Sequence, residues 1–380
     1  ELAQLVQSFH QAHWAQERWR GANLGGLLLL EPGPASPLFS AHGADACHDE
    51  WSLCEHLTKT LGEEGKRKAF ESHRLAHFGE STLAEIASRG LNAVRVPFGY
   101  WVVTGPTLGD PFVGPALGVL DQVVERARAA GLQVLLDLHG NPGGESSERP
   151  CGRAWRGWSW RSWRQEEALE VLRQVAARYC GSECVTGLQV CNEPSEAIPI
   201  GVLCDFYLGQ SAPSVPAAWA QSAWPWCSRC SRISAAPRPC LEVPQGEFPA
   251  VRQRGLRRAL LPHLQPHPLL PSHRQHLDIC EDHGLEVASM PAALVGEWSL
   301  ARPGRFAEEE IAAFAAAQVR AYDTASHGWF FWNWHDHEHL LGGTKGCLAL
   351  APPRQEGGDG GGGEGGGGGG GRRQGGRQPR

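Results

Sequence analysis

The chain has 380 residues, of which 41% are apolar and 20% charged, so it can bury a large core and has the composition of a globular protein. Its net charge of −6 does not suggest nucleic acid or an anionic membrane as partner. No apolar run reaches the roughly 18 residues that a membrane span requires.

Strand-like and helix-like segments alternate along the chain. A short apolar run, Leu27–Leu30, comes first and ends at Glu31. The later segments are helices at 78–89, 117–130, 166–179 and 308–325, and strands at 91–96, 132–138, 185–190, 294–298 and 328–334. Repeated units of helix, glycine and strand predict a parallel α/β sheet with right-handed crossover connections.

Polar or aromatic side chains recur where these strands end. They are Glu31, Arg95, His139, Asn192, Glu193, Glu297 and Trp332. In a (β/α)8 barrel the functional residues lie at the C-terminal ends of the strands. No glycine-rich dinucleotide fingerprint follows the first apolar run, which argues against an open doubly wound sheet. The pattern therefore predicts a (β/α)8 (TIM) barrel.

Two regions depart from this rhythm. Residues 209–275 are rich in Pro, Trp, Cys and Arg and show little periodicity, although strands 5 and 6 of a barrel belong here. We interpret this stretch as a mistranslated or aberrantly spliced segment that damages the barrel there; a genuine insertion is the alternative. Within residues 351–380, Gly357–Gly371 is almost pure Gly with scattered acids, and arginines follow it, which predicts a disordered tail. The predicted organisation is one barrel over 1–350 followed by this tail.

Two glutamates end short β-branched runs about a hundred residues apart. Glu193 lies in Gln189–Pro194, and Glu297 lies in Leu294–Ser299. Two carboxylates brought to one rim by two strands are what cleavage of a glycosidic bond requires. We predict that Glu193 is the general acid/base and Glu297 the nucleophile of a double displacement that retains the anomeric configuration. For any single glutamate, a surface or ion-pair role is the alternative.

Five further residues at the predicted rim are candidate sugar ligands. Arg95 would fix and ionise the nucleophile, unless it makes a structural ion pair. His139 would bind a sugar hydroxyl or be a satisfied core histidine, and Asn192 would bind the 2-hydroxyl. Glu31 would bind hydroxyls of a terminal sugar or cap a loop, and Trp332 would lie beneath the sugar or fill the core.

Tryptophan is unusually frequent, with fifteen Trp against four Tyr. An indole face packs well on the C–H face of a pyranose, although core filling explains many of these residues equally well. One group lies in a loop and the start of a helix: Trp155, Trp158, Trp160 and Trp163. This group is either a patch that docks a helix or an outer wall of a sugar site.

As an ordered set, the motifs of this chain resemble glycoside hydrolase family 5, and within it the exo-β-1,3-glucanases (glucan 1,3-β-glucosidases). The motifs are Arg20–Gly26, Leu30–Pro32, Asp49–Cys54, Gly90–Pro97 with Tyr100 and Trp101, Asp137–Gly140, Asn192–Pro194, Val295–Trp298 and Gly328–Trp332. The resemblance implies a (β/α)8 barrel, a retaining mechanism without metal or cofactor, and a secreted or cell-wall enzyme. It places acid/base and nucleophile on Glu193 and Glu297. The implied glucose-binding positions are Glu31, Arg95, His139, Asn192 and Trp332.

The chain departs from that family at two positions. The family has a His-x-Tyr pair after the sixth strand, whereas no tyrosine stands between Tyr207 and Tyr322 here. The tryptophan expected after Pro32 is replaced by Gly33. A catalytically impaired β-glucan-binding protein is therefore one alternative to an exo-acting β-1,3-glucanase, and an endo-β-1,4-glycanase or mannanase is another.

The partners and location follow from the same interpretation. We expect a β-glucan oligo- or polysaccharide as substrate, no nucleic-acid partner, and a monomer. We expect an extracellular or cell-wall protein by family resemblance. The chain begins at Glu1 without a basic and apolar leader pattern, which we interpret as a mature or truncated form.

Overall fold

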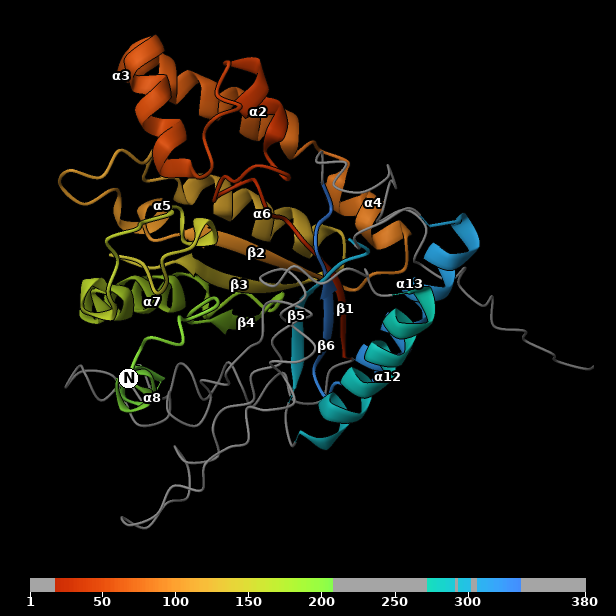
Figure 1. The fold of residues 1–380 in the computed structure, drawn as a ribbon. Helices are drawn as coiled ribbons and strands as arrows, with labels where there is room; N and C mark the ends of the chain where they lie inside the picture. The colour runs from red at the N-terminus through yellow and green to blue at the C-terminus, as the bar shows by residue number, and fades with distance from the viewer. Residues whose placement is uncertain (1–17, 208–271, 291–292, 302–305, 336–380) are drawn as a thin grey trace, which may run out of the picture.

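The computed structural model describes residues 18–207, 272–290, 293–301 and 306–335. Within them, six parallel strands form one sheet in the order β4-β3-β2-β1-β6-β5. The strands are β1 (Trp19–Asn23), β2 (Ala93–Gly99), β3 (Gln133–Gly140), β4 (Val185–Gln189), β5 (Leu294–Trp298) and β6 (Gly328–Phe331). β2, β3 and β4 are turned sharply away from β1, β5 and β6, so the sheet curls into part of a barrel (Figure 1).

The pairing of β1 has the pattern of a closing barrel. β1 pairs with β2 on one side and with β6, the last described strand, on the other. The two edge strands, β4 and β5, flank residues 208–271 in the sequence, and these lie outside the described residues. The predicted parallel α/β architecture is confirmed over six strands. The predicted damage at strands 5 and 6 lies outside the described part of the chain, as does the 351–380 tail.

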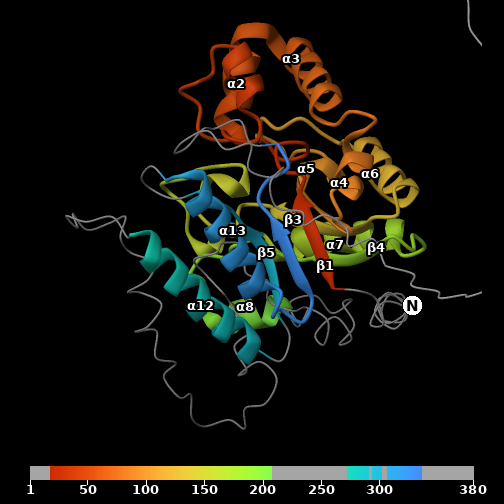
Figure 2. The same cartoon turned by 90° about the vertical axis from the view of Figure 1, so that its right-hand side faces the viewer.

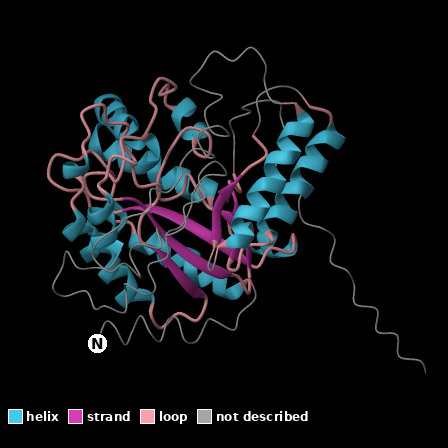
Figure 3. Ribbon diagram, turned by 60° about the horizontal axis from the view of Figure 1, so that its bottom comes forward, coloured by secondary structure: helices cyan, strands magenta, loops and turns pink. Residues whose placement is uncertain are grey.

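Helices surround the sheet (Figure 3). They are α2 (Ser36–Ala41), α3 (Glu50–His77), α4 (Thr82–Ser88), α5 (Trp101–Thr104), α6 (Leu117–Ala129), α7 (Gln165–Tyr179), α8 (Ile200–Tyr207), α12 (His273–Ser289) and α13 (Glu308–Tyr322), with short 3₁₀ turns at Arg149–Cys151 and Trp160–Ser162. α12 and α13 pack against each other beside β5 and β6 (Figure 2). None of the described helices is long and apolar enough to cross a membrane.

α6 shows why these sequences form outer helices. Its buried residues are Leu120, Val123, Val124 and Ala127, a spacing of three and four that puts one apolar stripe on one face. That stripe joins the core formed with the outward-facing residues of β2 and β3. Gly131, at φ +69°, then allows the backbone to leave the helix in a conformation that other residues rarely adopt.

Alternation along the strands separates an inner layer from this outer core. Trp19, Ala93, Leu135, Leu294 and Phe330 form one buried cluster, with one residue from each of five strands. Because successive side chains of a strand point to opposite faces, residues two positions further along lie on the same inner side, nearer the strand ends. This layer therefore supports whatever polar residues follow it at the rim.

β5 contains an irregularity that changes this alternation. Val295 and Trp298 both pack in an outer cluster beneath α13, although three positions separate them. The register of the β5–β6 pairing shifts between these two residues. An extra residue in one strand re-aims the side chains beside it, and here it frees Glu297 to face the inner side.

Two predictions about elements are wrong, and a third is confirmed with shorter bounds. The first strand is β1, and Leu27–Leu30 is a buried loop whose only described bridge joins Leu28 to Phe98; its leucines are apolar because they fill the core. The helix expected at 78–89 is present as α4, which begins after Ser81 and ends at Ser88. The irregular stretch drawn to residue 275 ends earlier, because Ser272 and Gln275 form a capping box that begins α12.

Candidate active site

Arg95 is the centre of a buried polar network at the C-terminal ends of the strands. Its guanidinium is fully buried. Nη1 donates to Oε1 of Glu297 at 2.7 Å, and Nη2 lies 2.7 Å from Oδ2 of Asp137. The predicted contact between Arg95 and Glu297 is therefore present, and it coexists with a buried structural ion pair.

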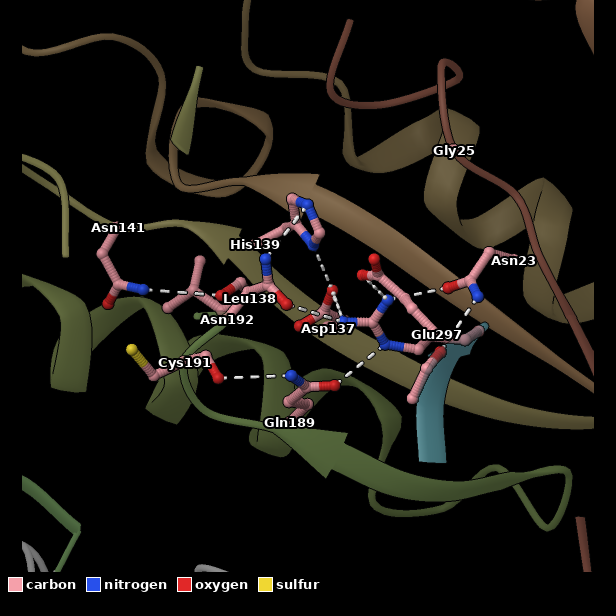
Figure 4. A network of polar contacts seen from close by, with 12 residues as sticks. Asn23, Gly25, Asp137, Leu138, His139, Asn141, Gln189, Cys191, Asn192 and Glu297 are labelled. Atoms are coloured by element: carbon pink, nitrogen blue, oxygen red, sulfur yellow. Dashed lines mark hydrogen bonds and ion pairs between the residues drawn. The ribbon is translucent and has the colours of Figure 1, made fainter. Parts of the chain in front are cut away.

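Three side-chain amides complete the shell of Arg95. Nε donates to Gln189 at 2.9 Å, Nη1 to Asn23 at 2.7 Å, and Nη2 to Asn192 at 3.1 Å, in each case to the amide oxygen. Figure 4 shows these amides converging with Asp137 and Glu297 from β1, β3, β5 and the end of β4 with its following turn. The N–H groups of a buried guanidinium need hydrogen-bond and ion-pair partners, because an unpaired charge in the interior is costly.

His139 joins the network through both ring nitrogens. Nδ1 is 2.7 Å from Oδ2 of Asp137, and Nε2 is 3.2 Å from Nδ2 of Asn192. Because the Asn192 NH₂ group can only donate, Nε2 accepts and Nδ1 carries the proton in this arrangement. Burial lowers the pKa of His139, but the charge and hydrogen bond of Asp137 outweigh it, so the pKa is raised. The ring is also stacked parallel to Trp332, with centroids 6.0 Å apart.

Glu297 is the most perturbed carboxylate of the network. Its side chain is 12% exposed, and burial raises its pKa to about 7. Arg95 lowers the pKa, as does His139 in its protonated form, whereas the negative charge of Glu193 raises it further. Arg95 thus acts in the predicted direction, but burial is the larger effect. The influence of Glu193 shows that both predicted catalytic carboxylates share one electrostatic environment.

Glu193 follows β4 in an unusual backbone conformation. Its φ is +42°, and it is the one non-glycine residue with positive φ in the described chain. Such a conformation costs on the order of 1–3 kcal/mol and persists only where the surroundings impose it. Pro194 follows directly, and the Ser195 N–H donates to the carbonyl oxygen of Glu145 at 2.9 Å. The turn that carries the half-buried Glu193 is therefore held on its C-terminal side.

Of the remaining two predicted ligands, Glu31 lies on a loop and Trp332 lies at a strand end. Glu31 is buried, and its carboxylate is 3.8 Å from Nε of Arg149, in the loop after β3. It follows β1 by eight residues, so its prediction as a strand-end residue is wrong. Trp332 directly follows β6, is half-buried, and donates its backbone N–H to the Trp298 carbonyl oxygen at 2.7 Å.

Three residues of the network were not predicted: Asn23, Asp137 and Gln189. Each lies on the inner side of its strand. Asn23 is four positions after Trp19 and Asp137 is two after Leu135, and both Trp19 and Leu135 belong to the inner layer; Gln189 pairs with Asp137 on the neighbouring strand. That alternation is the signal that could have found Asp137, two residues after Leu135. Asn23 has the same spacing from Trp19, but β1 was not among the predicted strands, so the signal could not be used there.

A curled parallel sheet with helices outside and polar residues at its rim defines the class of parallel βα barrels. Residues 62–208 match the model of the cellulase family, glycosyl hydrolase family 5. The chain is 38% identical over 197 residues to a probable glucan 1,3-beta-glucosidase A of Aspergillus niger, covering 51% of this chain and 45% of that protein. It is 33% identical over 199 residues to a glucan 1,3-beta-glucosidase of Pichia angusta, covering 51% and 45%.

The chain thus spans about half the length of the curated relatives it matches. Among solved structures, it is similar to rutinosidase from Aspergillus niger, with a TM-score of 0.62 at 16% identity over 87% of this chain and 94% of that one. AoRut gives the same score over 89% and 95%. At this identity the likeness supports the barrel fold alone.

The family resemblance inferred from the motifs is confirmed over residues 62–208, which match the glycosyl hydrolase family 5 model. That region contains β2, β3 and β4 with Arg95, His139, Asn192 and Glu193. Glu31, Glu297 and Trp332 lie outside the matched residues, so their roles depend on the geometry described above.

Proposed function

We propose that this protein is a retaining glycoside hydrolase that releases glucose from β-1,3-glucans. One observation carries the proposal: buried Arg95 bonds both the carboxylate of Glu297, on β5, and the side chain of Asn192, the residue directly before Glu193. Two interacting carboxylates at one rim fit acid/base and nucleophile roles. The names of the relatives, glucan 1,3-beta-glucosidases, support the substrate class.

The proposed reaction has two displacements. In the first, Glu193 donates its proton to the glycosidic oxygen while a carboxylate oxygen of Glu297 attacks the anomeric carbon, and a glycosyl ester forms as the leaving chain departs. In the second, Glu193 removes a proton from water, the water oxygen attacks the same carbon, and the Glu297 ester bond breaks. Two inversions leave the configuration retained.

The surrounding residues fit the recognition of one sugar. Trp332 is half-buried beside the parallel ring of His139, which suits a platform under a pyranose. Asn192 is held between Arg95 and His139, so its amide is preorganised near Glu193 for the sugar 2-hydroxyl. Glu31 beside Arg149 would bind the hydroxyls of a terminal glucose, which makes the action exo.

The partner and location follow from this proposal. The substrate would be a β-glucan oligo- or polysaccharide met outside the cell or in the cell wall, and the protein would act as a monomer.

Endo-β-1,4-glycanase action is the second candidate, since the matching family model is named for cellulase. Incubation with laminarin and with carboxymethylcellulose separates the two: glucose as the single early product from laminarin supports exo action, and shorter oligosaccharides from carboxymethylcellulose support the second candidate. A glycan-binding protein without catalysis is the third possibility, because no tyrosine lies between Tyr207 and Tyr322. Binding of laminarin by a cooperatively folded protein that releases no sugar would identify this case.

Azide rescue tests the proposed roles. Glu297→Ala should lose glucose release, and azide should then give the α-glucosyl azide by a single inversion. The matched variant Glu193→Ala should be rescued on an activated aryl glucoside to give the β-glucosyl azide. Unchanged glucose release by Glu297→Ala would overturn the assignment.

A further inference from the structure

We propose that Asn23 is a positioning residue that aligns both the nucleophile Glu297 and the sugar platform Trp332. The inference rests on the proposed function for the roles of those two residues. Asn23 ends β1 and is fully buried. Its single amide contacts groups from β2, β5 and β6.

The amide oxygen of Asn23 acts on the nucleophile through Arg95. It accepts a hydrogen bond from Nη1 at 2.7 Å, and the same nitrogen donates to Oε1 of Glu297 at 2.7 Å. Nη1 carries two hydrogens in a fixed plane. Holding one of them therefore fixes the direction of the other, which points at the reactive carboxylate.

The amide nitrogen of Asn23 acts on the backbone that carries both rim residues. Nδ2 donates to the carbonyl oxygen of Gly296 at 3.0 Å and to that of Phe331 at 3.2 Å. These carbonyls immediately precede Glu297 and Trp332 in the chain. One NH₂ group thus spans the β5–β6 pair near the irregularity that turns Glu297 inward.

The backbone of Asn23 is itself held, so its side chain has a fixed origin. Its carbonyl oxygen accepts from the Trp334 N–H at 3.0 Å, and the next residue, Leu24, donates to the Arg95 carbonyl oxygen at 2.9 Å. Beyond it, Gly25 exchanges hydrogen bonds with the side chain of Asn333 at 2.9 and 3.1 Å (Gly25 is labelled in Figure 4). A side chain of Asn length supplies one acceptor and two donors from this anchor, whereas aspartate lacks the donors.

A second asparagine on the same strand pair provides a matched control. Asn92 accepts from the Arg20 N–H at 2.7 Å and donates to the Arg18 carbonyl oxygen at 2.9 Å. It links β1 to the start of β2, at the opposite end from the rim. If the Asn23 amide only holds strands together, substitutions at Asn23 should have the same effects as substitutions at Asn92. If it positions the site, the effects should differ.

The experiment compares Asn23→Asp and Asn23→Ser with Asn92→Asp and Asn92→Ser. The Asn23 variants should lower kcat on laminarin by about a hundredfold, with a smaller change of KM, since misplacement of a reacting group by about 1 Å costs that much. They should also slow, by a similar factor, the burst of labelling by a 2-deoxy-2-fluoroglucosyl fluoride. The Asn92 variants should keep kcat within about twofold at a comparable loss of Tm. Equal kcat losses at both positions would overturn the proposal.

A readout without turnover separates this proposal from the proposed function. The titration of Glu297 is followed by NMR of ¹³C-labelled glutamate and identified by its loss in Glu297→Gln. Asn23→Asp places a second carboxylate on Nη1 of Arg95, so it should raise the midpoint of Glu297 by about one pH unit; Asn92→Asp should leave it in place. If the wild type releases no sugar, the proposed function fails while this shift still decides the role of Asn23. An unchanged midpoint in folded Asn23→Asp contradicts it.

If every Asn23 variant fails to fold, the proposal can be tested on the wild-type protein by NMR. The side-chain NH₂ resonances of Asn23 should shift with the same pH midpoint as Glu297, because Arg95 and the Gly296 carbonyl connect the two groups. Resonances that do not move through that titration overturn the proposal.

Discussion

Two buried carboxylates of this molecule have raised pKa values beside an arginine, yet their surroundings differ. Glu50, in α3, is 1% exposed and accepts the Leu30 N–H at 2.7 Å; burial raises its pKa to about 8 and Arg74 lowers it. The pKa of Glu297 is raised to about 7 by the same cause, and a second carboxylate acts on each group, Asp49 on Glu50 and Glu193 on Glu297. The side chain of Glu297, however, keeps 12% exposure. A perturbed pKa therefore does not identify a catalytic group, whereas access to substrate separates these two.

Removing each carboxylate should separate the two regions most strongly. Glu297→Gln should lower glucose release by about 10⁴-fold or more, as loss of a covalent nucleophile does. Glu50→Gln should keep activity within a few fold, because Glu50 contacts the backbone before Glu31 rather than the reacting centre. Initial rates on laminarin with matched Tm values provide the test. A large loss of activity in a stable Glu50→Gln variant would contradict the assignment of a structural role to Glu50 and a catalytic role to Glu297.

Removing each arginine should extend the comparison to stability. Arg95→Leu leaves Asp137 and Glu297 without their buried counter-ion and should cost about 3–5 kcal/mol together with nearly all activity. Arg74→Leu leaves only Glu50, which can take up a proton, so the loss should be smaller and activity should remain. Urea unfolding at pH 7 measures both. Equal losses of stability in the two variants would contradict the expectation that Arg95, which has more buried partners, contributes more to the folded state than Arg74.

The pH dependence of activity should report Glu297. The nucleophile must be ionised, so kcat/KM should fall about tenfold for each pH unit below about 7. Asp323→Asn, which alters an exposed ion pair with Arg20 far from the rim, serves as a control and should keep the same profile. An acidic limb centred near pH 4.5 in the wild type would show that burial does not govern Glu297.

The pH dependence of stability should report Glu50. Its pKa is raised on folding from 4.5 to about 8, so the folded state binds the extra proton. Its contribution is complete below pH 4.5 and is lost as the pH rises through 8. The difference in unfolding free energy between wild type and Glu50→Gln should therefore change steadily over that window, with the wild type losing stability. Parallel curves would exclude a raised pKa for Glu50.

The smallest expected effect concerns the helix cap beside Glu50. Asp49 caps α3 by accepting the Ser52 N–H at 2.8 Å. Asp49→Ala should cost about 1–2 kcal/mol and lower Tm while kcat stays within about twofold. Ser52→Ala, which keeps that N–H, is the milder control. A loss of kcat beyond the loss of folded protein would extend the functional region into α3.

The sequence predicted the parts of the site that local patterns encode. Arg95 lies within the apolar strand β2 and His139 near the end of β3, and strand alternation then implies that they share a face with Leu135. The inward turn of Glu297 depends on the register shift in β5, which arises from pairing with β6 and has no local signal. Asn23 escaped prediction because β1 was not among the predicted strands and its partners lie on three other strands.

The largest error in the fold has a similar cause. α3 was not predicted, because Gly62, at φ +72°, and Gly65 interrupt its helical pattern and only the Asp49 cap marks its start. Leu27–Leu30 looked like a strand because four leucines suit burial in any conformation. Tertiary packing, with Leu30 bonded to Glu50, decides that this run is a loop.

Trapping the covalent intermediate tests the central claim most directly. The folded protein is incubated with 2-deoxy-2-fluoro-β-D-glucosyl fluoride, digested, and its labelled peptide sequenced by mass spectrometry. The account predicts one fluoroglucosyl ester, on Glu297, which disappears in Glu297→Gln. A label on another carboxylate, or glucose release by an enzyme that accumulates no ester, would contradict it.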